Sequence, residues 1–338
     1  MKIAIYIDKG VYGGGQRVLI TLAREFYNRG LNPVVYTRQK EFDTSVVPCK
    51  VVTIDTAKGK FFQIIQFRNS FIKEQIDRII VFGCDTICYI ATLLTRVKYI
   101  YSLRVDPLQV NFNKFSYKHI INHCYKIVFQ TNKVQKHFTD NVKKRSMVIP
   151  NPILDDNLPE IQKEREKHVV LVARLSEEKN IPMAIHAFSK VNRKGYTLHL
   201  YGIGNQMDEL KKLVSELKLE KEVIFEGHVT RVIEKIKNAE ILLLTSNFEG
   251  MPNALIEGLA MGLACITTDF PSGAASDLIE DEKNGFIVPM NDIETLAQKL
   301  QLLIDNSNLR ENFQQNAINI RNKQNVETII NKWLNFIN

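Results

Sequence analysis

Cysteine and long apolar runs are both scarce in this sequence of 338 residues. The five cysteines are odd in number and scattered, and Cys84 and Cys88 have neither the spacing nor the histidine partners of a zinc site. We therefore expect buried, reduced thiols and a cytoplasmic protein. No run of 18 apolar residues occurs, so we expect no membrane-spanning helix. Residues 1–7 have the pattern of a strand and lack the cleavage site of a signal peptide.

A dinucleotide-binding fingerprint is also missing. A strand over 3–7, the glycines Gly13–Gly15, a helical run over 18–27 and a strand over 33–37 form a βαβ unit. The glycines do not follow the G-x-G-x-x-G spacing, and no acid ends the second strand. Three glycines still let a backbone approach a ligand closely, and the start of the next helix favours an anion. A plain tight turn explains the glycines about equally well.

Acidic residues are few in the first half of the chain. Residues 1–150 hold 24 lysines and arginines against 10 aspartates and glutamates, a net charge of +14, whereas the remainder has a net charge of −6. A basic half requires an anionic partner, and nucleic acid and an anionic membrane surface both qualify. Residues 111–145 combine eight basic residues and one acid with interleaved aromatics, which is typical of an amphipathic helix on an anionic bilayer. A solvated basic face with its aromatics in the core is the alternative.

Strand and helix patterns alternate through both halves, which predicts an α/β protein with two doubly wound domains. We place the first domain at residues 1–152 and the second at 168–315. The charged, turn-rich residues 153–167 are the expected linker. Residues 316–338 are expected to be helical, with a return to the first domain as one option.

The most informative stretch runs from residue 246 to residue 257. It follows an apolar strand over 241–244, passes through turn residues and enters a helix with Asn253 as a natural N-cap. Glu249 therefore stands at the carboxyl end of a strand and Glu257 in the first turns of a helix, where ligands bind to open α/β sheets. Taken alone, a surface loop charge and an acid favoured by the helix dipole are the simpler interpretation.

An ordered set of motifs surrounds this stretch and changes that interpretation. The motifs are Gly14–Arg17, Val148–Pro152, Val172–Leu175 with Lys179 and Asn180, Gly202–Gly204, Gly227–Val229 and Glu249–Glu257. Together they resemble the retaining glycosyltransferases of glycosyltransferase family 4, in that family's order and spacing and over nearly the whole chain. The stretch from Glu249 to Glu257 is similar to the family's glutamate–seven–glutamate motif.

The resemblance implies a GT-B fold, with two facing Rossmann-like domains and the active site in the interdomain cleft. It implies that Arg174 and Lys179 hold the diphosphate of a nucleotide-sugar, where fixed cations stabilise the leaving group. It assigns Glu257 to the ribose hydroxyls and Glu249 to the donor sugar. Further donor-binding residues implied by the resemblance are Gly14, Gly15, Gly202, His228, Val229, Gly250, Met251, Asn253, Ala254 and Leu255.

The implied reaction is retaining transfer of a hexose or N-acetylhexosamine from a UDP-sugar to a lipid-linked or surface-polysaccharide acceptor. This is the bacterial capsule and exopolysaccharide type, at the inner face of the plasma membrane. No Asp-x-Asp motif stands in a suitable place, so we expect neither a divalent metal nor a cofactor beside the donor. Many relatives carry a histidine after the strand near residue 100, where the corresponding segment of this chain, residues 103–106, has Arg104 and Asp106. These two contact acceptor or sugar, or form a structural salt bridge, and we count Asp106 among the candidate catalytic residues.

Other functions fit parts of the sequence. A UDP-sugar epimerase of similar fold is one, although the pair Glu249 and Glu257 argues against it. A nucleic-acid-binding protein would explain the basic half, but no recognised reading motif occurs and the site in the second half would have no purpose. We therefore expect no nucleic acid among the partners. A catalytically silent partner subunit is disfavoured because Arg174, Lys179 and both glutamates are present.

Overall fold

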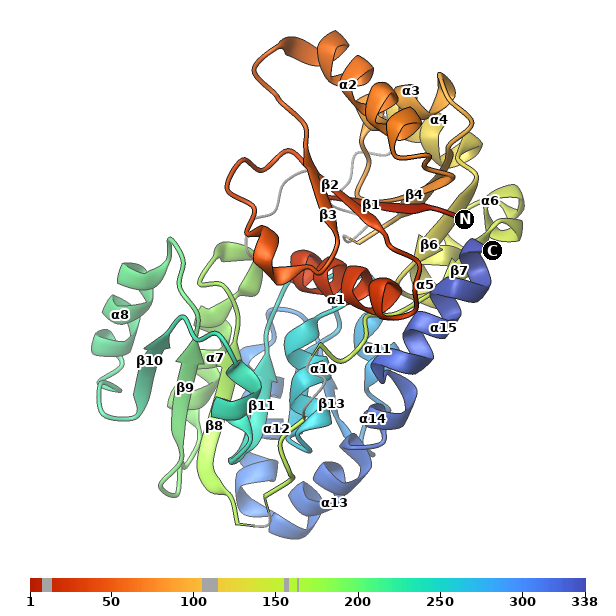
Figure 1. Ribbon diagram of the computed structural model, residues 1–338. Helices are drawn as coiled ribbons and strands as arrows, with labels where there is room; N and C mark the ends of the chain where they lie inside the picture. The colour runs from red at the N-terminus through yellow and green to blue at the C-terminus, as the bar shows by residue number, and fades with distance from the viewer. Residues whose placement is uncertain (8–13, 105–114, 155–157, 163) are drawn as a thin grey trace. The chain divides into compact units, whose positions relative to one another are not determined.

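The computed structural model describes residues 1–7, 14–104, 115–154, 158–162 and 164–338. The chain divides into two compact units (Figure 1). Unit 1 consists of Met1–Leu154 together with Val326–Asn338, and unit 2 consists of Asp155–Asn325. Each unit contains one parallel sheet with helices on its faces, so the prediction of two doubly wound α/β domains is confirmed.

The sheet of unit 1 has the strand order β3-β2-β1-β4-β5-β6-β7. Every neighbouring pair is parallel. The strands are β1 Ile3–Ile7, β2 Val34–Thr37, β3 Lys50–Thr53, β4 Arg78–Phe82, β5 Lys98–Ser102, β6 Lys126–Phe129 and β7 Ser146–Val148. Because helices cover both faces of such a sheet, the central strands β4 and β5 are buried from their second residue onward.

Helices from both ends of the chain cover the sheet of unit 1. They are α1 Gly14–Asn28, α2 Gly59–Lys73, α3 Thr86–Leu93, α4 Phe115–His123, α5 Asn132–Lys136, α6 Asp140–Lys144 and α15 Val326–Ile337, with a 3-10 turn at Thr44–Val46. Helices α1 and α15 share a core with Ile3 and Ile5 of β1, in which Trp333 is fully buried. Helices α2, α3 and α4 cover the opposite face, where Phe67 packs edge-on against Tyr6.

Of the two interpretations of residues 111–145, the single amphipathic helix is not what the structure shows. The described part of this stretch contains α4, strand β6 and helices α5 and α6. Strand β6 carries the consecutive apolar residues Ile127, Val128 and Phe129, which have no helical period and are buried between β5 and β7. A strand in the interior of the sheet therefore runs through this basic stretch.

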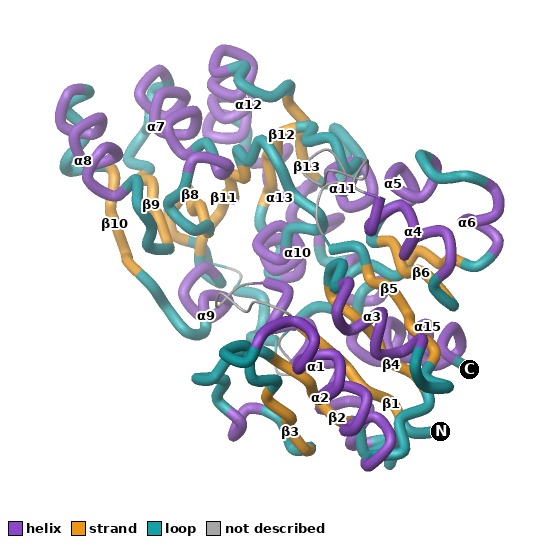
Figure 2. Tube along the Cα trace, turned by 90° about the horizontal axis from the view of Figure 1, so that it is seen from above, coloured by secondary structure: helices purple, strands orange, loops and turns teal. Residues whose placement is uncertain are grey.

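The sheet of unit 2 has the strand order β10-β9-β8-β11-β12-β13, and its strands follow one another in this order in Figure 2. All pairs are parallel. The strands are β8 Glu166–Val172, β9 Thr197–Tyr201, β10 Val223–Gly227, β11 Ala239–Leu244, β12 Ala264–Thr268 and β13 Gly285–Val288. The helices are α7 Ile181–Lys190, α8 Met207–Glu216, α9 Val232–Ile236, α10 Asn253–Ala260, α11 Ala274–Leu278, α12 Ile293–Asp305, α13 Ser307–Ala317 and α14 Ile320–Lys323, with a 3-10 turn η3 at Glu177–Lys179.

The strand order of unit 2 reverses between β8 and β11. Successive strands are added on one side of β8 up to β10, and the chain then returns to start β11 on the other side. In an open α/β sheet, ligands bind outside the carboxyl ends of the strands at this switch point. The loops that follow β8 and β11 therefore form the expected site of unit 2.

The cysteines are free thiols, and three of them, Cys88, Cys124 and Cys265, are buried. Burial raises the pKa of Cys49 and of Cys124 to about 11, so both thiols stay protonated near neutral pH. Within the part of the chain that the structure describes, every helix is too short or too polar to cross a membrane.

Candidate active site

The loops after β8 and β11 bring together two residues that are far apart in the sequence. Lys179 ends the turn η3, and its Nζ lies 2.7 Å from Oε1 of Glu249, in the loop after β11. Both side chains are more than four-fifths buried, at 18% and 13% exposure. The hydroxyl of Ser246 donates a hydrogen bond to the same carboxylate oxygen at 2.7 Å. The switch point thus holds a cation and a carboxylate in one cluster.

Hydrogen bonds fasten the two loops to each other. The backbone N–H of Asn247 donates to the carbonyl of Glu178 at 2.9 Å. The hydroxyl of Thr245 donates to the carbonyl of Lys179 at 3.1 Å. Asn180 adopts a left-handed conformation with φ 45° and donates from its amide to Asn247 at 3.3 Å. These bonds fix the position of Lys179 relative to Glu249 before any ligand binds.

Arg174 supplies a second cation on the loop after β8. Its side chain is 57% exposed and forms an ion pair of 3.0 Å with Glu178. Burial opposes ionisation of Glu178, but a hydrogen bond from Ser176 and the charges of Arg174 and Lys179 outweigh it and lower its pKa. An exposed ion pair contributes little to stability, so an anionic ligand can recruit Arg174 from Glu178 at small cost.

Glu257 lies in helix α10, which begins directly after the Glu249 loop. Its side chain is 3% exposed. The prediction that Asn253 caps this helix is wrong: Pro252 is the N-cap residue, with φ −77° and ψ 111°, and Asn253 is the first helical residue. Proline takes the cap position because its ring fixes φ and its ψ is extended here, and no side chain caps the helix from this position.

The glycines after β9 pack against the loop that carries Arg174. Gly202 has φ 142°, and a Cβ there would lie 1.8 Å from the carbonyl oxygen of Ala173. A Cβ on Gly204 would lie 2.1 Å from the carbonyl oxygen of Leu175. The backbone N–H of Leu175 donates to the carbonyl of Ile203 at 3.0 Å. In the structure Gly202 therefore supports the Arg174 loop by close backbone packing.

The other predicted donor-binding residues of unit 2 occupy two regions. His228 is exposed and Val229 half-buried, and both follow β10, two strands away from β8. The carbonyl of Gly250 accepts a hydrogen bond of 3.1 Å from the hydroxyl of Ser272, which holds the Glu249 loop against the loop after β12. The remaining predicted residues lie beside it or in the first turn of α10: Met251 and Leu255 are buried, whereas Asn253 and Ala254 are half-buried.

Two predicted residues lie in unit 1 and one lies outside the described residues. Gly14 and Gly15 begin helix α1, and a Cβ on Gly15 would meet nothing within 4 Å. Asp106 is not among the described residues, and neither is Gly13.

Arg104, next to Asp106 in the sequence motif, follows β5. Its guanidinium carbon lies 4.1 Å from the ring centroid of Phe82 and 5.7 Å from that of Trp333. Its Nη1 donates to Oδ1 of Asn151 at 2.6 Å, and its Nε donates to the hydroxyl of Ser102 at 3.0 Å. Among the described residues no carboxylate forms an ion pair with Arg104. Burial lowers the pKa of Arg104 to about 9, so its guanidinium remains charged at neutral pH.

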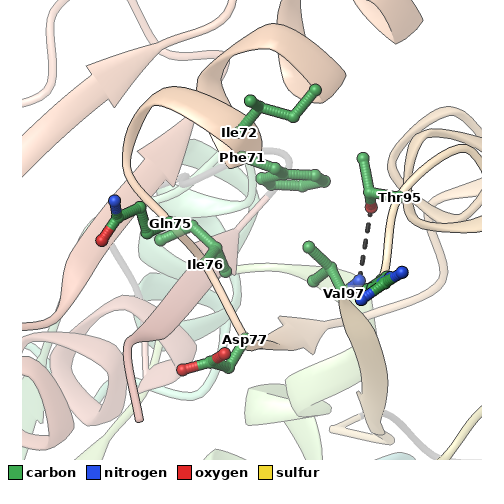
Figure 3. Close-up of a pocket in the computed structure, with 8 residues that line it drawn as sticks. Phe71, Ile72, Gln75, Ile76, Asp77, Thr95 and Val97 are labelled. Carbon is green, nitrogen blue, oxygen red and sulfur yellow. Dashed lines mark hydrogen bonds between the residues drawn. The ribbon is translucent and has the colours of Figure 1, made fainter.

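A depression of about 220 Å³ in unit 1 lies away from these residues (Figure 3). Asp77 and Val97, which precede β4 and β5, belong to its lining, as do Phe71 and Ile72 at the end of α2. It is therefore at the amino-terminal edge of the sheet, opposite to the edge where ligands of α/β sheets bind. We assign it no part in the candidate site.

Comparison with known proteins identifies the class of the second unit. Residues 155–320 match the family model of Glycosyl transferases group 1. These residues are a glycosyl transferases group 1 domain. The match contains Arg174, Lys179, Glu249 and Glu257, so the candidate site lies inside the family region.

Relatives of the whole chain are bacterial glycosyltransferases. The amylovoran biosynthesis glycosyltransferase AmsD of Erwinia amylovora is 23% identical over 100% of this chain and 99% of its own length. An N-acetylgalactosaminyltransferase of Campylobacter jejuni, named for an undecaprenol-diphosphate-linked acceptor, is 25% identical over 100% and 98%. A further relative matches only part of the chain. The poly(ribitol-phosphate) α-N-acetylglucosaminyltransferase of Staphylococcus aureus is 31% identical over 51% of this chain, and the match spans 36% of that protein's length.

Solved structures show the same fold over the whole chain. HepE from Anabaena in complex with UDP has a TM-score of 0.86 at 19% identity and covers 100% of this chain and 99% of its own. TarM from Staphylococcus aureus has a TM-score of 0.81 at 16% identity, with 100% and 99% covered. The predicted GT-B fold and the resemblance to bacterial polysaccharide glycosyltransferases are confirmed.

Proposed function

We propose that the protein is a glycosyltransferase that moves a hexose or N-acetylhexosamine from a UDP-sugar to a lipid-linked or surface-polysaccharide acceptor, with retention of anomeric configuration. The observation that carries the proposal is the buried pair of Lys179 and Glu249 at the switch point of unit 2, with Arg174 on the same loop as Lys179. Two similar proteins support it: HepE was crystallised in complex with UDP, and the Campylobacter relative is named for a lipid-diphosphate acceptor.

The donor site provides charges where the leaving group becomes negative. As the bond between the anomeric carbon and the phosphate oxygen breaks, Lys179 and Arg174 stabilise the charge that grows on the diphosphate. Glu257 accepts hydrogen bonds from the ribose hydroxyls, and Glu249 accepts hydrogen bonds from hydroxyls of the donor sugar. The acceptor hydroxyl forms the new bond on the face that the diphosphate leaves, and its proton passes to the departing phosphate.

The same two cations are proposed to make a divalent metal unnecessary in the chemical step. A metal would neutralise the diphosphate, and Arg174 and Lys179 offer two positive charges for that purpose. The expected result is full activity in the presence of a chelator. Activity that disappears with the chelator and returns with Mg²⁺ would contradict this part of the proposal.

The donor class is tested by thermal denaturation with ligands. UDP is expected to raise the melting temperature, because a ligand that binds only the folded state stabilises it, whereas NAD and duplex DNA are expected to have no effect. A panel of UDP-sugars screened for slow hydrolysis then identifies the donor. The absence of a shift with UDP would contradict the proposal. Conversion of a UDP-sugar to its epimer without acceptor would favour the epimerase.

We also propose that the enzyme works at the inner face of the plasma membrane and contacts it through unit 1. Residues 1–150 have a net charge of +14, and an anionic leaflet attracts such a surface. A lipid-linked acceptor is presented at this location, so attachment to the leaflet would bring the enzyme to its second substrate.

A further inference from the structure

Two neighbouring helices of unit 1 carry apolar side chains on their outward sides. Of the sixteen large hydrophobic side chains that are exposed among the described residues, seven lie on α2, on α3 or directly after α3. These seven are Phe61, Phe62, Ile65, Ile72, Ile90, Leu93 and Leu94, and we call them the α2–α3 surface. Helices α2 and α3 contact each other and cover the same face of the sheet (Figure 1).

Helix α2 is apolar on both of its sides. Its inner side buries Phe67 and Phe71 in the core of unit 1. Its outer side carries Phe61, which is 76% exposed, and Ile65 and Ile72 at helical spacing. A surface helix of a water-exposed domain normally has a polar outer side, so the outer side of α2 needs an apolar partner.

Helix α3 continues this surface. Its buried side carries Cys88 and Ala91, whereas Ile90, Leu93 and Leu94 are exposed at the spacing of one helical face. Leu93 is 62% exposed.

The charges within α2 are all positive, and its C-cap residue Glu74 forms an ion pair with Lys50. The helix contains Lys60, Arg68 and Lys73 and no aspartate or glutamate. Lys58, just before it, places its ammonium group 4.9 Å from the ring centroid of Phe62. Long basic side chains can keep their charges at the level of lipid headgroups while their stems and the neighbouring aromatics enter the apolar layer. This combination matches an anionic bilayer.

A second copy of the chain is a poorer occupant. A symmetric dimer through this surface would place the basic residues of α2 against those of the other copy, and like charges across an interface repel. We propose that the α2–α3 surface is the membrane contact of the enzyme and lies on an anionic bilayer. This inference rests on the proposed function for its biological purpose. The lipid binding that it predicts can be measured without a sugar donor or acceptor.

The test is sedimentation with vesicles of phosphatidylcholine, with and without about 30% phosphatidylglycerol. The wild-type protein is expected to bind the anionic vesicles and to dissociate from them as salt is raised. The double variant Phe61→Ser with Leu93→Ser is expected to lose binding by at least about tenfold. The matched control is Leu302→Ser, which removes a side chain that is 41% exposed in unit 2, and it is expected to bind like the wild type.

A second variant separates charge from apolar contact. Lys60→Gln, Arg68→Gln and Lys73→Gln together are expected to lower partitioning onto anionic vesicles by about two orders of magnitude at low salt. Anionic binding that the double and triple variants leave unchanged would overturn the inference. So would a dimer in solution that Phe61→Ser with Leu93→Ser converts to monomer. Thermal stabilisation by UDP is measured in every variant: its retention shows that unit 2 is intact, and its absence from the wild type would refute the proposed function instead.

Discussion

Nζ of Lys179 lies 2.7 Å from Oε1 of Glu249, although 70 positions separate them in the sequence. The pair exists because β8 and β11 are neighbours in the sheet while their loops are distant in the chain. Under the proposed function, donor binding rearranges a preformed ion pair: the diphosphate would compete with Glu249 for Lys179, and the sugar would compete with Lys179 for Glu249.

Lys179→Met is expected to abolish stabilisation by UDP and to lower the transfer rate by about a hundredfold or more, because a fixed charge at the leaving group is lost. Lys190→Met is the control, since Lys190 forms an ion pair with Glu294 on the surface of the same unit. Thermal shift and single-turnover rates measure the two effects. Equal behaviour of both variants would remove Lys179 from the donor site.

Glu257→Gln is expected to weaken UDP binding by roughly tenfold or more, because hydrogen bonds to a charged group are stronger than those to a neutral one. The sharper measurement compares UDP with 2′,3′-dideoxy-UDP. The wild type should prefer UDP clearly, and Glu257→Gln should bind the two almost equally. A preference that survives the substitution would mean that Glu257 does not hold the ribose.

Gly15→Ala and Gly202→Ala are expected to have opposite effects on stability. Gly202→Ala should destabilise the protein by about 2 kcal/mol or more, since its Cβ meets Ala173 and its φ is 142°. Gly15→Ala should keep or slightly raise the melting temperature, because Gly15 lies in α1 with open space around a Cβ. If activity nevertheless falls in Gly15→Ala, a ligand must approach that backbone closely. Full activity of Gly15→Ala would exclude such a close approach.

Arg104→Met is expected to leave the stability within about 1 kcal/mol of the wild type or to raise it, because it removes a desolvated charge that has no counter-ion among the described residues. The control is Arg38→Met, which leaves the buried Asp85 without its ion-pair partner and should lower stability by about 3 kcal/mol. If Arg104 contacts acceptor or sugar, Arg104→Met lowers the transfer rate without changing UDP affinity. A large loss of stability would instead assign Arg104 a structural role.

Acidification is expected to destabilise unit 2 through His168. Its ring centroid lies 4.0 Å from that of His199, Glu166 lies 3.0 Å from its Nδ1, and Glu226 pairs with His199. Burial and the charge of His199 lower the pKa of His168 below 6.5. The unfolded chain therefore takes up the proton first, so the stability present above pH 6.5 is lost as the pH falls toward the lower pKa of the folded state.

This effect is measured as the change in melting temperature between about pH 7 and pH 5. His168→Gln should flatten the change, whereas His186→Gln in α7 should keep the slope of the wild type. An unchanged slope in His168→Gln would assign the acid sensitivity to other groups.

Local pattern predicted most of the strands and the long helices. The strand expected at 3–7 coincides with β1, and the apolar run before Glu249 is the end of β11. Such elements are predictable because period and apolar content are local properties. The fold class followed from their alternation.

Properties that depend on distant partners were not predictable. The amphipathic helix considered for 111–145 does not form, because Ile127–Phe129 pair with two neighbouring strands, and strand pairing is not a local property. The prediction for Asn253 failed because its residue type favours a cap, whereas the backbone gives that position to Pro252. The sequence motifs named Lys179 and Glu249 as site residues, but their ion pair depends on strand order.

Helix α15 has a consequence for the order of events during synthesis. Ile329, Ile330 and Trp333 are fully buried in a core that they share with β1, which precedes unit 2 in the chain. During synthesis, unit 1 cannot complete its hydrophobic core until unit 2 and then α15 have been made. Removal of α15 should therefore destabilise unit 1 more than unit 2.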